Sequence, residues 1–452
     1  MGGTAGPARF AILSRTIRAA LAVAVALVAA APLASAHAPV PPYRVSWEVE
    51  LPTPVGAPAT AGMTAIVVGS DAVLGIDEMT GAIAWSVPRA GGPLLRPAVG
   101  YVDGEAVVVY VEEAETAATA SPSPGAAKPA DLVAIDLETR AERWRVTFDA
   151  GLPGGVLAWG ANAYVVDGTG TLTAVSLDDG ITAWEQASVG AGETPAVGYD
   201  DAIYVAGGGA TTGTARISAF DAATGERIWA KSPETATSST SGLAVSADAV
   251  AYAGNDRLLH VLDRADGTER WTALLGNLPS PVTAPLIDGD DVFVVDFSGT
   301  VGRFDLATGG RVWSFPLNDL VVRSSPFLSG DTVLIGTNGG RLVGIDRETG
   351  HLVADLETGE GLLGGLAVPE ELLVVAKGGA DPRLLGVVTD TGAQLLDVAS
   401  PIEPDFLGLL GRFAVAAAAA LLIIGVPPRL AGLLRRSRRE LAASDPDAGG
   451  TP

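Results

Sequence analysis

The sequence predicts an all-β fold, an eight-bladed β-propeller, with a seven-bladed ring as the alternative. Three observations lead there: a segment of the form D-x-x-x-G-x-x-x-W recurs, its copies are evenly spaced, and the composition favours strands and turns. The 452 residues include 57 Gly and 30 Pro, which suit many short strands joined by tight turns. Closed all-β folds of this length form one unit.

The repeated segment is clearest in DAATGERIW at 221–229, DRADGTERW at 263–271 and DLATGGRVW at 305–313. Imperfect copies carry Arg140 at the Gly position and Ser176 at the Asp position. The motif residues are Asp77, Gly81, Trp85, Asp136, Trp144, Gly180, Trp184, Asp221, Gly225, Trp229, Asp263, Gly267, Trp271, Asp305, Gly309, Trp313, Asp346 and Gly350.

The spacing of the copies indicates the size of one structural unit. Successive copies begin at 77, 136, 176, 221, 263, 305, 346 and 388, so the intervals are 59, 40, 45, 42, 42, 41 and 42 residues. A period near 42 is typical of a four-stranded propeller blade. The interval of 59 contains EEAETAATASPSPGAAKPA at 112–130, which we expect to be a disordered loop insert because it is acidic and rich in Ala and Pro.

Each unit reads as four strands, and the repeated segment joins the third to the fourth. Asp is expected to open a type I turn, Gly to close it at positive φ as a bulge, and Trp to fill the gap between neighbouring blades. The repeat is therefore a structural turn. RVSWEV at 44–49 resembles an orphan fourth strand with Trp47 in the packing position, and we expect it to pair into the last blade and close the ring.

Two apolar segments predict the topology of the chain. Residues 1–36 end in Ala-Ser-Ala after an apolar run and resemble a signal peptide, with an uncleaved anchor as the alternative. Residues 406–426 predict one transmembrane helix. The tail, 427–452, begins with an Arg cluster, so the positive-inside rule places it in the cytoplasm. The propeller, 37–400, would then lie outside the cytoplasmic membrane.

Charge and cysteine usage exclude several function classes. Residues 1–36 and 406–452 each contribute +3 to the formal net charge of −23, so residues 37–405 carry −29. Such an acidic domain repels nucleic acid, so we expect no nucleic-acid partner. The chain has no Cys, which removes thiolate metal sites and a Cys nucleophile.

Few residues suggest chemistry. The chain has three His, and DGDD at 288–291 lacks the spacing of a calcium loop, so we expect no metal site and no catalytic residue. His260 is expected to be a packed or edge residue of a third strand. Arg96 and Arg323 lie in the connections that lead to inner strands, where a cation at the channel mouth could bind an anionic ligand.

Two longer stretches carry a resemblance to a known family. YVAGGGATTGTARISAFDAATGERIWAKS and VFVVDFSGTVGRFDLATGGRVWSF resemble the PQQ-type (pyrroloquinoline quinone) β-propeller repeat, over residues from about 70 to 400. That family includes quinoprotein alcohol dehydrogenases and the non-enzymatic outer-membrane assembly lipoproteins of the BamB type. The resemblance implies the fold. The dehydrogenases have adjacent cysteines and a Ca²⁺ site that nothing here matches, so we transfer no catalytic residue and expect no cofactor.

These observations favour a membrane-tethered extracytoplasmic propeller that acts as a non-catalytic interaction or assembly scaffold. The expected partner is a membrane or cell-envelope protein. The alternative, supported by the repeat resemblance alone, is a PQQ-dependent oxidoreductase or a sensor of a quinone or another small ligand.

Overall fold

A computed structural model gives the fold of the chain. The described residues are 43–114, 128–187, 190, 194–207, 215–233, 241–276, 283–321, 324–359, 362–368, 372–377 and 382–389. The chain divides into two compact units, 1–390 and 391–452, and the second lies outside this described part. The predicted signal peptide 1–36, membrane helix 406–426 and tail 427–452 also lie outside it.

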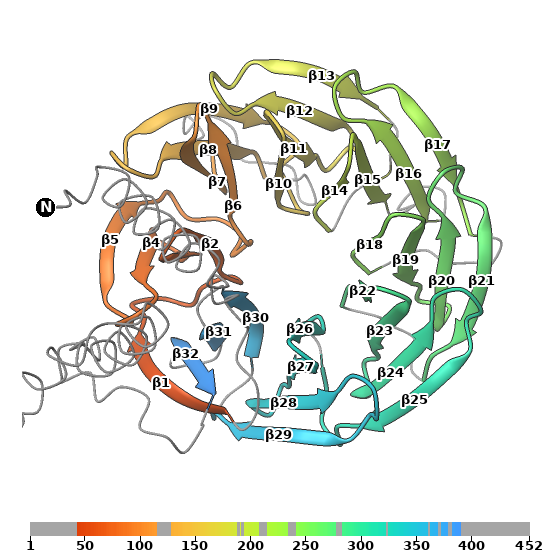
Figure 1. Ribbon diagram of the computed structural model, residues 1–452. Helices are drawn as coiled ribbons and strands as arrows, with labels where there is room; N and C mark the ends of the chain where they lie inside the picture. The colour runs from red at the N-terminus through yellow and green to blue at the C-terminus, as the bar shows by residue number, and fades with distance from the viewer. Residues whose placement is uncertain are drawn as a thin grey trace, which may run out of the picture. The chain divides into compact units, whose positions relative to one another are not determined.

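The described residues form eight four-stranded antiparallel sheets, which we number as blades 1 to 8 around the ring in Figure 1. Blade 1 is β2 (Ala59–Ala61), β3 (Thr64–Val68), β4 (Ala72–Asp77) and β5 (Ile83–Pro88); blade 2 is β6 (Ala98–Val102), β7 (Glu105–Glu113), β8 (Ala130–Asp136) and β9 (Glu142–Phe148); blade 3 is β10 (Val156–Trp159), β11 (Asn162–Val166), β12 (Leu172–Ser176) and β13 (Thr182–Gln186); blade 4 is β14 (Val197–Tyr199), β15 (Ala202–Gly207), β16 (Arg216–Asp221) and β17 (Arg227–Lys231).

The other four blades follow the same order. Blade 5 is β18 (Ala244–Val245), β19 (Ala249–Ala253), β20 (Leu258–Asp263) and β21 (Glu269–Leu274); blade 6 is β22 (Leu286–Asp288), β23 (Asp291–Val295), β24 (Thr300–Asp305) and β25 (Arg311–Pro316); blade 7 is β26 (Phe327–Ser329), β27 (Thr332–Gly336), β28 (Arg341–Asp346) and β29 (Leu352–Glu357); blade 8 is β30 (Leu362–Val368), β31 (Leu372–Lys377), β32 (Arg383–Thr389) and β1 (Tyr43–Glu50).

The N-terminal strand closes the ring, which confirms eight blades over seven. β1 pairs antiparallel with β32, from Tyr43 opposite Thr389 to Glu50 opposite Arg383, and so supplies the fourth strand of blade 8 (Figure 1). The segment 44–49 therefore has the expected place. Because the first and last parts of the chain share one sheet, opening the ring requires breaking a complete strand pair.

The hydrophobic core is divided among the junctions between blades. Eight buried clusters occur in the described part, and each draws its side chains from two neighbouring blades. The second strands are buried throughout, as in AIYVAG of β15, whereas the outer β25 alternates toward solvent. A single blade would leave both faces of its inner strands uncovered, so the blades depend on one another for burial.

The repeated segment has the turn geometry that its residue types favour. In blade 6 the Asp305 carboxylate accepts hydrogen bonds from the backbone N–H and hydroxyl of Thr308, both at 2.7 Å, and Gly309 has a φ of 72°. The strand register shifts just before the Asp, between Arg303 and Phe304, which marks a bulge. Arg140 occupies the same left-handed conformation at a φ of 62°.

Each repeated Trp packs against the turn of the next blade. The Trp229 indole lies over Gly267, where a β-carbon would come within 2.6 Å of the ring, and its Nε1 donates to the Arg264 carbonyl at 2.9 Å. The glycine is therefore required for its conformation and for the space that the ring occupies. The same stacking joins Trp47 to Gly81, Trp144 to Gly180, Trp184 to Gly225, Trp271 to Gly309 and Trp313 to Gly350.

Two junctions differ from this arrangement. Between blades 1 and 2 the guanidinium of Arg140, at the Gly position, lies 5.7 Å from the centre of the Trp85 ring. Between blades 7 and 8 the Trp position is Ala354, and the turn that it would face, after β32, lies outside the described residues.

The Trp contact predicts unequal costs for two Gly→Ala substitutions. Gly267→Ala should destabilise by about 1–2 kcal/mol from its positive φ and by a further ~1–3 kcal/mol from its overlap with Trp229. Gly289 has a φ of 58°, and no atom lies within 4 Å of the point that a β-carbon would occupy, so Gly289→Ala isolates the first effect. Urea unfolding measures both; equal costs would contradict the packing role of the ring.

The turn carboxylates predict a loss of stability in acid. Hydrogen bonds from Thr308 lower the pKa of Asp305 below its ordinary 3.8. A lowered folded-state pKa stabilises the fold above the unfolded value, and this contribution is lost as the pH falls through the folded value. Asp305→Asn should therefore be less stable than the parent at about pH 6, and the difference should shrink below about pH 3.8. Urea unfolding across this range checks it; a constant difference contradicts it.

Candidate functional site

The inner strands of blades 1 to 4 line a cavity of about 600 Å³ in the central channel. Its walls come from Ala59–Thr60 of β2, the β6 segment 95–99, the β10 segment 154–159 and the β14 segment 194–198. These are the strands nearest the centre of the ring in Figure 1. Apart from Arg96, their lining side chains are Ala, Val, Leu, Pro, Thr and one Trp, so the wall is mostly apolar.

Arg96 is the one charged residue among the described residues that line this cavity. It is exposed to solvent, and it makes no hydrogen bond or ion pair with any other described residue. Protein atoms around the guanidinium partly desolvate it, which lowers the pKa of Arg96. Arg323, the other predicted channel-mouth residue, lies outside the described residues.

Trp159 belongs to the same cavity and was missed by the sequence analysis. Its indole packs over Gly198 of blade 4, its Nε1 donates to the Asp200 carbonyl at 2.9 Å, and 36% of its surface remains exposed. Its position in the sequence could have singled it out. The other seven of the 8 Trp occupy the packing position of the repeat, and Trp159 does not. Trp159 of blade 3 thus contacts blade 4, and its exposed part can still face a ligand or a partner.

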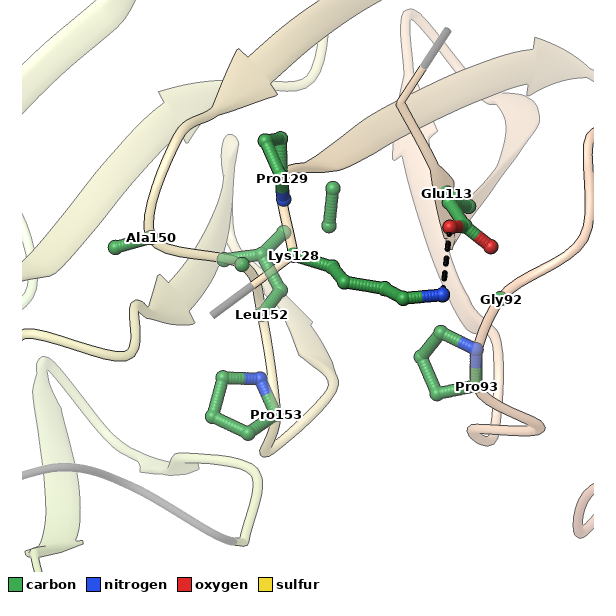
Figure 2. Close-up of a pocket in the computed structure, with 10 residues that line it drawn as sticks. Gly92, Pro93, Glu113, Lys128, Pro129, Ala150, Leu152 and Pro153 are labelled. Atoms are coloured by element: carbon green, nitrogen blue, oxygen red, sulfur yellow. Dashed lines mark hydrogen bonds and ion pairs between the residues drawn. The ribbon is translucent and has the colours of Figure 1, made fainter. Parts of the chain in front are cut away.

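A second pocket, of about 490 Å³, lies beside the β7–β8 hairpin of blade 2. Figure 2 shows the rings of Pro93, Pro129 and Pro153 around it, with Lys128 reaching Glu113 at 3.0 Å. Leu152 forms part of its wall. Apart from this one exposed ion pair, the pocket offers no polar group positioned for chemistry among the described residues that line it.

The expected insert at 112–130 is too long at both ends. Glu112 and Glu113 belong to β7 and Ala130 to β8, and only 115–127 lies outside the described residues. Glu112 is 2% exposed because its carboxylate pairs with Arg145 and accepts from the backbone N–H of Ala90. Composition alone could not reveal this, since the strand extension depends on a counter-charge from β9.

Two charged networks stand out in the described part, one centred on blade 2 and one between blades 6 and 7. In blade 2, Arg145 also pairs with Asp131 at 2.9 Å, and its bond to Glu142 is the main cause that raises the pKa of the guanidinium. Between blades 1 and 2 the buried Arg89 donates to the Gly69 carbonyl at 2.6 Å and the Val111 carbonyl at 2.8 Å. These charges are held by partners and are unavailable as acids or bases.

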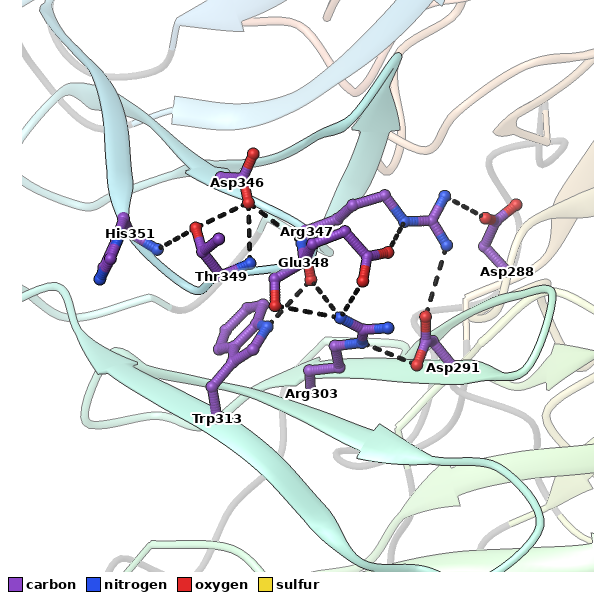
Figure 3. Close-up of polar contacts among 9 residues, drawn as sticks. All are labelled: Asp288, Asp291, Arg303, Trp313, Asp346, Arg347, Glu348, Thr349 and His351. Carbon is purple, nitrogen blue, oxygen red and sulfur yellow. Dashed lines mark hydrogen bonds and ion pairs between the residues drawn. The ribbon is translucent and has the colours of Figure 1, made fainter.

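Figure 3 shows the second network, between blades 6 and 7. Arg347 pairs with Asp288 at 2.6 Å and with Asp291 at 3.4 Å, while Arg303 pairs with Asp291 at 2.7 Å and Glu348 at 3.0 Å. The bond to Asp291 is the main cause that raises the pKa of Arg303. The DGDD segment at 288–291 is therefore a turn whose carboxylates bind arginines.

His260 is fully buried on β20 of blade 5, in agreement with a packed residue. Its two ring nitrogens lie 2.9 Å from Glu269 and 3.0 Å from Asp256, and its ring stacks on Tyr252 with centroids 4.7 Å apart. With both nitrogens engaged, the imidazole has no free atom to take a proton from a substrate. We assign it a structural role.

Metal and quinone chemistry find little support among the residues that are described. No group of three or more His, Cys, Asp or Glu side chains is arranged to hold a metal ion within them. The channel cavity presents no carboxylate in its described lining. This donor set does not fit a Ca²⁺-bound quinone, since hard cations need several oxygen ligands, and we derive no reaction step through such a group.

Within the described part of residues 43–389, no helix is long and apolar enough to cross a bilayer.

The fold and its channel define an eight-bladed propeller built from PQQ-like repeats. A family model described as outer membrane protein assembly factor BamB matches residues 128–215 and 213–361. The chain belongs to this PQQ-like propeller family. It is 30% identical over 161 residues to outer membrane protein assembly factor BamB of Burkholderia pseudomallei (strain K96243), a match that covers 34% of this chain and 39% of that protein.

Solved structures share the fold at lower sequence identity. BamB from Moraxella catarrhalis has a TM-score of 0.60 at 20% identity, covering 76% of this chain and 99% of that one. A europium-containing methanol dehydrogenase has 0.59 at 14%, covering 76% and 93%. A quinohemoprotein alcohol dehydrogenase from Comamonas testosteroni has 0.59 at 15%, covering 79% and 78%. Proteins described as an assembly factor and as dehydrogenases share this architecture, so fold likeness alone does not assign a function.

The network in Figure 3 predicts different costs for two neighbouring carboxylates. Asp291 is 7% exposed and serves two arginines, so Asp291→Ala should destabilise by about 3 kcal/mol because two partly buried guanidinium groups lose a counter-charge. Asp288 has a side chain that is 43% exposed, so Asp288→Ala should cost less than about 1 kcal/mol. Urea unfolding measures both, and equal costs would contradict the assigned role of Asp291.

Proposed function

We propose that the chain is a non-catalytic scaffold, tethered to the cytoplasmic membrane with its propeller outside, that binds another protein of the cell envelope. Membership of the family whose model describes an assembly factor supports the scaffold role. The apolar segment 406–426 and the Arg cluster after it support the tether and its orientation. Exposed side chains on blades 1 to 3 support a particular binding surface.

The observation that carries this proposal is a group of exposed apolar side chains on one face of blades 1 to 3. Strand direction places the first-to-second turns and the third-to-fourth turns of every blade on the same face. On this turn face lie Met63, Met79, Tyr101 and Trp159, which are 41%, 52%, 58% and 36% exposed. The backbone N–H of Glu78 donates to the Met63 carbonyl at 3.0 Å, which joins the two turns that carry the methionines.

The residue types of this group are those of protein interfaces. Tyr, Trp and Met are enriched at the centres of interfaces because they bury large areas and, for Met, adapt to irregular surfaces. The chain has 3 methionines, and two of them, Met63 and Met79, lie on this face. Neither side chain is buried, so core packing does not explain their placement.

The proposal predicts a partner whose recovery depends on this face. Full-length protein carrying Met79→Asp and Tyr101→Asp should lose a partner that the parent captures from membranes after crosslinking, by about tenfold or more. The matched control is Ile228→Asp on the outer strand β17, which replaces a side chain that is 52% exposed elsewhere on the ring. Mass spectrometry of the captured material gives the yield of each protein.

Two results would contradict the proposal. Failure to recover a reproducible partner with the parent protein would remove the scaffold role. Equal recovery with the parent and the double variant would leave a scaffold but place its binding surface elsewhere.

A further inference from the structure

The central channel offers a second kind of site, which shares Trp159 with the turn face. Its cavity of about 600 Å³ has the size of a small-molecule pocket. The walls around it are neutral and largely apolar, with Val99, Leu157 and Val197 among the lining residues and Thr60 and Thr194 as hydroxyl donors. A ligand of suitable shape would bury apolar surface there and meet few charged groups.

Arg96 is unusual among the described arginines near the interior. Arg89 is bound by backbone carbonyls, and Arg145, Arg303 and Arg347 each bind carboxylates. Arg96 has no such partner in the described part of the chain, although residues 37–405 carry a net charge of −29. Arg96 is exposed within the cavity, where the surrounding protein atoms lower the pKa of its guanidinium, so a bound anion could approach it directly.

We propose that the cavity beside Arg96 binds a small organic monocarboxylate with an apolar body. The planar guanidinium donates two parallel hydrogen bonds to a carboxylate, which would supply the missing counter-charge. One Arg and neutral hydroxyl groups suit a single negative charge, whereas the net charge of −29 on residues 37–405 repels a polyanion such as a nucleotide. The Val, Leu and Trp159 side chains of the wall would cover the apolar part of the ligand.

Benzoate and benzamide are suitable probes because they have nearly the same shape and differ in charge. The experiment measures binding to the full-length protein by calorimetry and by the rise in unfolding temperature, with chloride added to equalise ionic strength. Benzoate should bind and raise the unfolding temperature. Benzamide should have little effect.

Three variants assign the effect to one residue. Arg96→Gln should weaken benzoate binding by roughly tenfold or more, because it removes a charge-assisted pair. Arg96→Lys keeps the charge but loses the paired N–H donors of the guanidinium, so its benzoate affinity should fall between those of the parent and Arg96→Gln. Arg227→Gln on β17 removes an exposed Arg from the outer strand and should bind benzoate like the parent.

Several results would overturn the proposal. Equal binding of benzoate and benzamide would show that charge is not recognised, and equal benzoate affinity in the parent and Arg96→Gln would place the site elsewhere. An absence of benzoate binding to the parent at tens of millimolar would reject a monocarboxylate site. Arg96→Lys keeps the charge and serves as the test if Arg96→Gln fails to fold. Equal benzoate affinity in Arg96→Lys and the parent would then contradict the role of the guanidinium fork.

Discussion

The packing of a Trp from one blade against the turn glycine of the next is the contact on which the ring depends. It joins a conformational requirement, the positive φ of Gly267 and its equivalents, to the burial of a large ring and a hydrogen bond from its Nε1. Since every hydrophobic cluster in the described part also spans two blades, each blade is stable only beside its neighbours. Trp47 on β1 brings the last such contact to Gly81 and completes the circle.

The junction of blades 1 and 2 shows how the ring tolerates a different residue at this position. Arg140 takes the left-handed conformation that Gly usually occupies, and its guanidinium lies near the Trp85 ring, a favourable cation–π arrangement. Arg89 crosses the same junction and donates to carbonyls of both blades, Gly69 in blade 1 and Val111 in blade 2. Charge–dipole and cation–π contacts there accompany the loss of the Trp–Gly stacking.

The sequence predicted what depends on local chemistry and failed where contacts cross between blades. Asp, Gly and a 42-residue period sufficed for the turn and favoured eight blades over seven, and the expected pairing of RVSWEV with β32 decided between them. The strand character of Glu112 was missed because its counter-charge, Arg145, is 33 residues away. The sequence also could not show that Arg96 has no partner among the described residues. That depends on the side chains of neighbouring inner strands, and none that is described pairs with it.

The positions that depart from the repeat are the ones that can carry specificity. A surface presented eight times in similar form cannot direct a partner to one side of a ring, whereas a unique residue can. Met63, Met79, Tyr101 and Arg96 all lie in blades 1 and 2, and Trp159 lies in the adjoining blade 3. The extended β7–β8 hairpin and its proline-lined pocket are also in blade 2. Blades 4 to 6 keep the full repeat, so they supply the rigid frame that holds these positions in a fixed relation.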